Sequence, residues 1–90
     1  MALKTSYIEL NKDYQIILDN SGQNSSADNF IQVNHGTAEL FFDTDTPSSS
    51  SIGLRWSAGA RILFVPQGSK LYGRLWKNSD SCSVIVNKDS

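Results

Sequence analysis

The feature that most constrains the fold is a succession of short β-prone runs, each closed by turn-forming residues. Nowhere do apolar residues recur at the three-and-four spacing of a helix for three turns without an interrupting glycine or proline. The sequence therefore predicts an all-β protein, an antiparallel β-sandwich or jelly-roll-like fold of about eight short strands with no substantial helix. The expected strands span residues 7–10, 14–18, 30–33, 37–42, 52–56, 61–65, 70–76 and 82–86.

A chain of 90 residues is expected to form one domain, residues 1–90, which buries roughly 60–65% of its unfolded surface. Domains of this size usually need a disulfide, a structural metal or association with another body. Cys82 is the single cysteine and His35 the single histidine, so neither an internal disulfide nor a four-ligand zinc site is expected. No metal and no cofactor are predicted. Self-association or docking on a larger body remains as the source of added stability.

Alternation along the expected strands predicts which side chains face the core. In the run 70–76, for example, Leu71, Gly73 and Leu75 lie on one face. Taking one apolar face from each strand, the predicted core consists of Ile31, Val33, Leu40, Leu54, Ile62, Phe64, Leu71, Leu75, Val84 and Val86.

The opposite face of the run 70–76 carries Tyr72, Arg74 and Trp76. These residue types are enriched where proteins touch partners, so this face is predicted to be an interface. Trp56 and Phe42 complete the set of candidate interface residues. The alternative is that the aromatic side chains cover a sheet edge or complete the second layer, since aromatic residues favour strands in any context.

Two long polar stretches separate the strands. Residues 19–29 are rich in Asn, Ser, Gly and Asp and are predicted to form an open loop. Residues 43–51 begin with Asp43 and Asp45, a spacing that opens many calcium loops, but the required glycine bend and later bidentate acid are missing. Pro47 opposes strand pairing, and halves of about 40–45 residues are too small to fold on either side of a linker. This stretch is therefore predicted to be a surface connection that crosses between sheets.

Two short connections contain glycine. Residues 34–36, Asn-His-Gly, are predicted to join two strands as a three-residue hairpin with glycine at positive φ. Residues 66–68, Pro-Gln-Gly, are predicted to form a turn with proline in its second position. His35 is thus expected to be a solvated turn residue. A catalytic role for it would need a nucleophile and an orienting carboxylate, and the chain has no Gly-x-Ser-x-Gly motif, so no catalytic residue is predicted.

Cys82 begins the last β-prone run and has the same phase as Val84. It is therefore predicted to be a buried, inert thiol. The alternative, a redox centre, would require nearby cations that lower the pKa of the thiol.

The charge of the chain argues against a nucleic-acid partner, and the length of its apolar runs argues against a membrane span. The formal net charge is −1, and the eight basic residues are dispersed along the sequence, whereas binding to a nucleic-acid backbone needs a concentrated positive field. Residues 62–65 are among the longest apolar runs, far short of a membrane span. No nucleic acid and no membrane partner are predicted. The first residues do not resemble a signal peptide, which is the pattern of a protein made in a cytoplasm.

The order of elements over residues 28–88 resembles that of small all-β bacteriophage virion proteins. The segments that carry the resemblance are "FIQVNHGTAELFF", the polar loop with proline that follows it, "GSKLYGRLW" and the final "SVIVNKD". This class includes short capsid decoration or cement proteins and the compact β-modules of tails, spikes and fibres. Its members are typically jelly rolls or sandwiches, often trimers, that bind other virion subunits.

The resemblance implies a non-enzymatic structural protein of the virion, most simply a capsid decoration subunit. Its expected partners are copies of itself in a homotrimer and a larger virion protein such as the major capsid protein. The alternative function is a carbohydrate- or receptor-binding module of a phage tail. In that case Trp56, Trp76 and Tyr72 would form a stacking platform for a sugar ring, with Asn and Ser of the adjacent loops as hydrogen-bonding groups.

Overall fold

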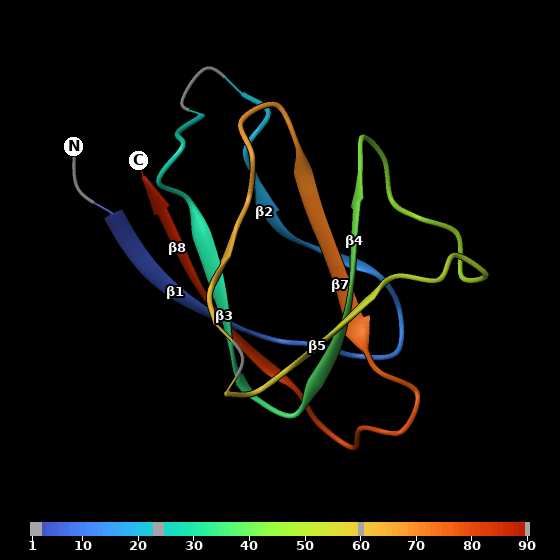
Figure 1. Ribbon diagram of the computed structural model, residues 1–90. Coiled ribbons are helices and arrows are strands. Elements are labelled where there is room, and N and C mark those ends of the chain that lie inside the picture. The colour runs from blue at the N-terminus through green and yellow to red at the C-terminus, as the bar shows by residue number, and fades with distance from the viewer. Residues whose placement is uncertain (1–2, 23–24, 60, 90) are drawn as a thin grey trace.

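The computed structural model describes residues 3–22, 25–59 and 61–89. Eight strands account for its regular structure, and the part of the chain that is described contains no helix (Figure 1). The strands are β1 (Leu3–Glu9), β2 (Gln15–Asp19), β3 (Phe30–His35), β4 (Thr37–Asp43), β5 (Leu54–Ser57), β6 (Leu63–Phe64), β7 (Lys70–Leu75) and β8 (Ser83–Asp89). Each strand overlaps one of the eight predicted runs.

The strands form two four-stranded antiparallel sheets, in the orders β1-β8-β3-β6 and β2-β7-β4-β5. Six of the seven connections pass from one sheet to the other, so that consecutive strands usually lie in different layers (Figure 1). This is the strand order of an eight-stranded jelly roll. The predicted all-β sandwich is therefore confirmed.

Apolar side chains from both sheets form one core. The pairing register of the strands decides which side chains face the core. Leu40 pairs with Gly73 and Ile31 pairs with Val86, and these positions face the space between the sheets. Gly73 leaves room there for Ile17, whose side chain occupies the volume that a Cβ at residue 73 would take. The core consists of Leu10, Ile17, Leu18, Ile31, Val33, Ala38, Leu40, Val65, Leu71, Cys82, Val84 and Val86. Leu75, also predicted, is partly buried against it.

Three residues predicted for the core are exposed: Leu54, Ile62 and Phe64. They belong to β5, to β6 or to the segment between them, and β5 and β6 are the last strands at one side of the two sheets. Because β6 has only two residues, it leaves the inner face of the longer β5 uncovered. This accounts for Leu54, which pairs with the core residue Leu40. Ile62 and Phe64 were instead assigned to the wrong face, because Leu63 and Val65, which alternate with them, contact the core.

The connections were predicted in the wrong places. Gly36 separates β3 from β4, but these strands lie in different sheets, so the predicted hairpin at residues 34–36 does not form. Conversely, β4 and β5 are paired neighbours, and the polar stretch 43–51 joins them within one sheet instead of crossing between sheets. In this fold the long loop closes a hairpin, and a single glycine carries the chain to the other sheet.

Gly36 makes that crossing possible in two ways. Its φ of +78° lies in the left-handed region, and a Cβ there would lie only 1.9 Å from the carbonyl oxygen of Ser81. At the other turn, the amide of Ser69 donates to the carbonyl of Pro66 (3.2 Å) and Gly68 has a φ of +88°. Pro66 therefore occupies the first position of its turn, one earlier than predicted.

The predicted open loop at residues 19–29 is instead anchored by two fully buried amides, Asn20 and Asn29. Asn20 Nδ2 donates to the carbonyls of Ser26 (2.8 Å) and Val65 (2.7 Å), and its Oδ1 accepts from Asn29 Nδ2 (2.7 Å). Asn29 Oδ1 accepts from the amide of Asp89 (2.7 Å). These bonds tie Asn20 and Asn29 to the end of β6 and to β8, whereas the residues beside them, Ser21, Gly22, Ala27 and Asp28, are exposed.

Candidate functional site

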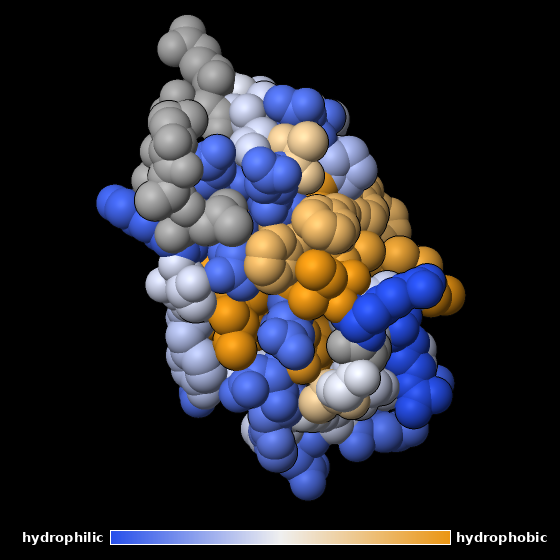
Figure 2. Space-filling view, turned by 60° about the vertical axis from the view of Figure 1, so that its left-hand side comes forward, coloured by the Kyte–Doolittle hydropathy of each residue, from blue (hydrophilic) through white to orange (hydrophobic). Residues whose placement is uncertain are grey.

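The side of the sandwich formed by β5 and β6 exposes large apolar side chains. Ile52 is 83% exposed, Leu54 and Phe64 are each 53% exposed, and Ile62 is also exposed. We call these four residues the β5–β6 patch. On the face shown in Figure 2, hydrophobic side chains form one continuous area bordered by hydrophilic ones. Exposed apolar area of this kind, rimmed by polar residues, is typical of contact sites for other proteins.

Part of the β5–β6 patch is concave. A hollow of about 350 Å³ opens beside β4 and β5. On the other sheet, the ring of Phe64 packs against that of Phe30 at 5.6 Å between centroids, which holds the exposed ring in place. A concave apolar surface with fixed walls can receive apolar side chains of a partner. The hollow is lined by Leu40, Phe41, Phe42, Ile52, Gly53 and Leu54.

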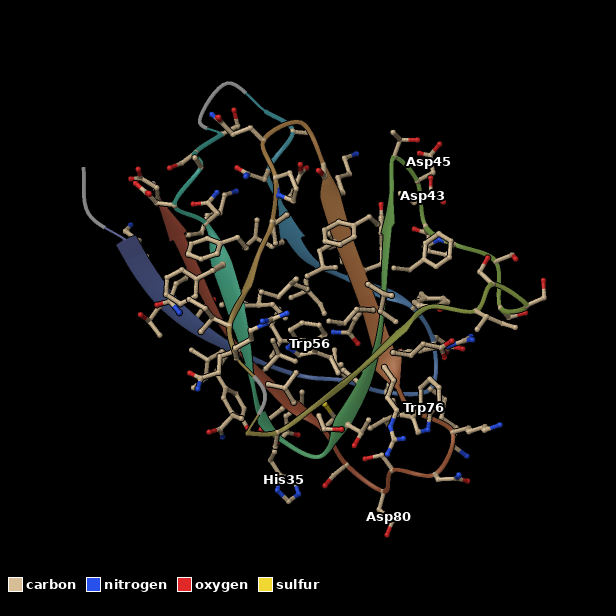
Figure 3. The ribbon with its side chains drawn as sticks, viewed as in Figure 1. His35, Asp43, Asp45, Trp56, Trp76 and Asp80 are labelled. Carbon is tan, nitrogen blue, oxygen red and sulfur yellow. The ribbon has the colours of Figure 1, made fainter. Side chains whose placement is uncertain are left out.

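The five predicted interface residues do not form one surface. Tyr72 is buried, and Trp56 lies partly buried against the core, with its Nε1 donating to the carbonyl of Arg61 (3.1 Å). Trp76 is half-buried away from Trp56, as Figure 3 shows, with the guanidinium of Arg55 5.7 Å from its ring centroid. Phe42 lines the apolar hollow together with Ile52 and Leu54 of the β5–β6 patch.

Arg74, the remaining candidate, is committed to contacts within the chain. Its Nε donates to Glu39 Oε1 (2.7 Å), and its two terminal nitrogens donate to the carbonyls of Ser49 and Ser51 (2.9 Å each). The amide of Gly53 donates to the other oxygen of Glu39 (2.7 Å). One ion pair thus holds the second half of the β4–β5 loop, residues 49–53, and Pro47 within that loop is buried.

Aromatic contacts complete this cluster. The guanidinium of Arg74 lies 4.1 Å from the ring centroid of Tyr14, whose hydroxyl donates to the carbonyl of Ser51 (3.0 Å). Tyr14 also meets Phe41 edge-to-face at 6.0 Å. Sequence reasoning missed Tyr14 and Glu39 as structural residues, because alternation indicates apolar faces and says nothing of a charged pair covered by a loop.

The charges of the cluster stabilise each other. Burial by itself raises the pKa of Glu39, but the hydrogen bonds from Arg74 and from the amide of Gly53 outweigh it and hold that pKa below its ordinary value of 4.5. The hydrogen bond to Glu39 in turn raises the pKa of Arg74. Burial, followed by the charge of Glu39, raises the pKa of the Tyr14 hydroxyl. The pair is therefore ionised and acts as a structural clamp at neutral pH.

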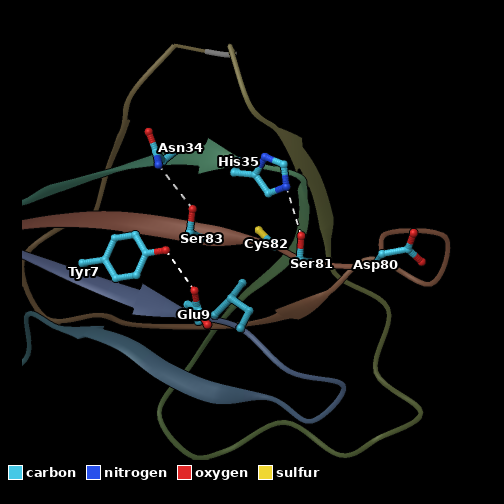
Figure 4. A pocket seen from close by; sticks show the side chains of 9 residues that line it. Tyr7, Glu9, Asn34, His35, Asp80, Ser81, Cys82 and Ser83 are labelled. Atoms are coloured by element: carbon cyan, nitrogen blue, oxygen red, sulfur yellow. Dashed lines mark hydrogen bonds between the residues drawn. The ribbon is translucent and has the colours of Figure 1, made fainter.

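A polar hollow of about 520 Å³ lies where the ends of β1 and β3 meet the loop before β8 (Figure 4). His35 and Asp80, at the same end of the sandwich in Figure 3, both line it. His35 Nε2 is 3.0 Å from Ser81 Oγ, and Tyr7 donates from its hydroxyl to Glu9 Oε1 (3.0 Å). The hollow is lined by Tyr7, Glu9, Leu10, Asn34, His35, Asp80, Ser81, Cys82 and Ser83.

His35 and Ser81 are close enough to act as a base and a nucleophile, but acyl transfer needs further groups. Catalysis would need a carboxylate that bonds His35 Nδ1 and so orients the ring. Within the described residues no carboxylate makes that bond. The pair therefore has the geometry of a surface hydrogen bond.

Cys82 borders the polar hollow, but its side chain is buried in the core. Burial raises the pKa of the Cys82 thiol to about 11, so the thiolate is scarce near neutral pH. This agrees with the predicted buried, unreactive thiol.

Neither membranes nor metals are indicated by the described residues. In residues 3–22, 25–59 and 61–89 there is no helix long and apolar enough to cross a bilayer. The same residues contain no group of three or more His, Cys, Asp or Glu side chains placed to hold a metal ion.

Comparison with known proteins finds no matching family model, no similar curated protein and no similar solved structure. The jelly roll, the β5–β6 patch and the two hollows are therefore the features of the molecule that bear on its function.

Proposed function

We propose that the protein is a non-enzymatic structural subunit of a bacteriophage virion, a capsid decoration protein that binds a larger virion protein such as the major capsid protein. The observation that carries the proposal is the β5–β6 patch, an exposed apolar surface on a domain that has no disulfide. The jelly roll supports it, since this fold is used by many viral capsid domains. So does the resemblance of residues 28–88 to small virion proteins.

The docking surface is the β5–β6 patch together with the adjacent apolar hollow. Fully burying one large aliphatic or aromatic side chain stabilises a complex by about 1.5–3 kcal/mol before association costs. Two of the four patch residues, Ile52 just before β5 and Phe64 on β6 of the other sheet, are both at least half exposed. A partner that contacts both side chains would bury the side of the sandwich that the short strand β6 leaves exposed.

Self-association is the second part of the proposal. The virion proteins that the sequence resembles are often trimers, so copies of this chain are expected to meet around a three-fold axis of the shell. Light scattering of the purified chain tests assembly in solution, and electron cryomicroscopy of the phage particle tests assembly on the shell. Density for this jelly roll at the outer capsid surface, with β5 and β6 turned toward the major capsid protein, is the expected result. Its absence from the particle would refute the virion role.

The alternative of a tryptophan platform for sugar is less well supported. Trp56 packs on the core, and Arg55 lies over the ring of Trp76. A stacking platform needs an open ring face, and neither tryptophan is among the exposed large apolar residues.

A further inference from the structure

From the chemistry of the polar hollow, we infer that it binds a neutral sugar ring. This site is separate from the β5–β6 patch, and the inference does not depend on the proposed docking function. The hollow takes residues from β1, β3 and the segment that enters β8, all of which belong to one sheet or its borders.

The walls of the polar hollow are fixed before any ligand arrives. Ser79 Oγ donates to the carbonyl of Ser81 (2.9 Å) and accepts from the amide of Thr37 (3.2 Å). The amide of Leu10 donates to the carbonyl of Cys82 (2.9 Å), and Gly36 packs directly on the Ser81 backbone. A binding site with such preset walls loses little conformational entropy when the ligand binds.

The hollow offers both hydrogen-bond donors and acceptors. Glu9 and Asp80 present carboxylate oxygens, Asn34 an amide, and His35 an imidazole whose Nε2 already meets Ser81. Asp80 has no hydrogen-bond partner for its carboxylate within the described residues. Sugar hydroxyls both donate and accept, so a ring with several of them matches this mixture better than an apolar ligand or a ligand that only donates.

Tyr7 supplies an apolar wall for the carbon face of a sugar. Its side chain is 58% exposed, and its bond to Glu9 restrains the ring at the mouth of the hollow (Figure 4). Aromatic rings with a polar tip serve well where one side of a ligand is apolar and the other is wet. The volume of about 520 Å³ is within the ~300–1,000 Å³ of small-molecule sites.

The charge of the hollow indicates a neutral sugar. Glu9 and Asp80 are carboxylates, and none of the lining residues is a lysine or arginine. A uronic or sialic acid would bring a third negative charge into this space, and like charges at close range repel. Neutral hexoses avoid that cost.

Titration of the folded chain with galactose, glucose and N-acetylglucosamine, followed by amide NMR shifts, tests the inference. At least one of the three should bind with a Kd of about 1–10 mM and shift the amides of residues 7–9, 34–35 and 80–83. The uronic acid that corresponds to the sugar that binds should bind at least about tenfold more weakly than that sugar. Asp80→Ala, at an exposed loop position, should weaken sugar binding about tenfold, whereas Trp76→Ala should leave it unchanged.

Three results would overturn the inference. One is the absence of shifts at the polar hollow with all three sugars. Another is equal binding of the neutral sugar that binds and its corresponding uronic acid. The third is a stronger response to methylammonium than to any sugar, which would make the hollow a cation site. A variant that lacks the docking surface, Ile52→Ser/Phe64→Ser, should retain sugar binding, so failure of the docking proposal is distinguishable from failure of this one.

Discussion

Arg74 and Glu39 lie opposite each other on the paired strands β7 and β4, with 2.7 Å between Arg74 Nε and Glu39 Oε1. Both side chains are largely shielded, at 16% and 9% exposure. An ion pair of this kind is costly to break, because the remaining charge stays partly buried without a partner.

The stability of the protein should therefore fall in acid. The pKa of Glu39 is lower in the folded chain than its ordinary 4.5, so the stabilisation is complete above pH 4.5 and is lost as pH falls through the folded value. Glu39→Gln should cost about 2 kcal/mol at pH 7 and flatten this part of the pH profile. Urea unfolding followed by tryptophan fluorescence between pH 7 and acid measures both effects.

Asp19 provides the control for that profile. Hydrogen bonds from Ser21 hold the pKa of Asp19 below its ordinary value as well, so this carboxylate also loses stabilisation in acid. Asp19→Asn should remove only a small part of the pH dependence, since the group is near the surface. A pH profile that Glu39→Gln leaves unaltered would show that the ion pair is not the main acid-sensitive contact.

Arg74→Lys should release the β4–β5 loop while preserving the charge. Lysine cannot reproduce the bonds that the guanidinium makes to Glu39, Ser49 and Ser51 together. Amide hydrogen exchange and limited proteolysis in residues 44–53 should accelerate by about tenfold or more, with the rest of the sandwich unchanged. Arg55→Lys, on β5 of the same sheet, is the matched control, and equal loop exchange in both variants would count against the clamp.

The hydrogen bonds of the buried side chains Asn20 and Asn29 should contribute strongly to stability, although both residues lie in a polar stretch of the sequence. Asn20→Ala leaves the carbonyl of Val65 without its side-chain donor and removes the partner of Asn29, which should cost about 3 kcal/mol. Asn78→Ala, at an exposed position, should change the free energy of unfolding by less than about 0.5 kcal/mol. Reaction of the buried Cys82 thiol reports unfolding independently, and similar labelling rates in the two variants would contradict the network's role.

Gly36 should tolerate no side chain. Gly36→Ala forces a methyl group onto the Ser81 carbonyl in addition to the strain of positive φ, and should cost about 3 kcal/mol or more. Gly59 has a similar φ of +86°, but a Cβ there would meet nothing within 4 Å. Gly59→Ala should therefore cost only about 1 kcal/mol. Equal losses in thermal unfolding would mean that φ alone, and not the contact with Ser81, decides the effect.

The sequence predicts the strands well because they depend on local alternation. Leu71 and Val84 were assigned to the core from their phase alone, and both are fully buried. Turn composition did not predict the topology: residues 34–36 have the composition of a hairpin, yet the chain leaves the sheet there because Gly36 can press against Ser81. Partners distant in sequence decide which sheet a strand joins.

The functional surfaces were harder to predict for the same reason. Phe64 was assigned to the core from its phase, but Leu63 and Val65 are the residues that contact the core, and Phe64 lies on the other face of the strand beside Phe30. Tyr72 was predicted to contact a partner, but it is buried within this chain. The polar hollow joins residues from positions 7 to 83, and no local pattern brings Tyr7 and Asp80 together.

Under the docking proposal a phage encodes this chain, and the most direct test is the affinity of the purified chain for particles of that phage, after removal of the endogenous copies. Wild type and the control Ile16→Ser, whose changed side chain is 44% exposed on β2, should bind saturably and alike. Ile52→Ser/Phe64→Ser, with an unchanged fold, should bind at least about tenfold more weakly. Equal binding of the double variant and wild type, or no binding by wild type, would contradict docking through the β5–β6 patch.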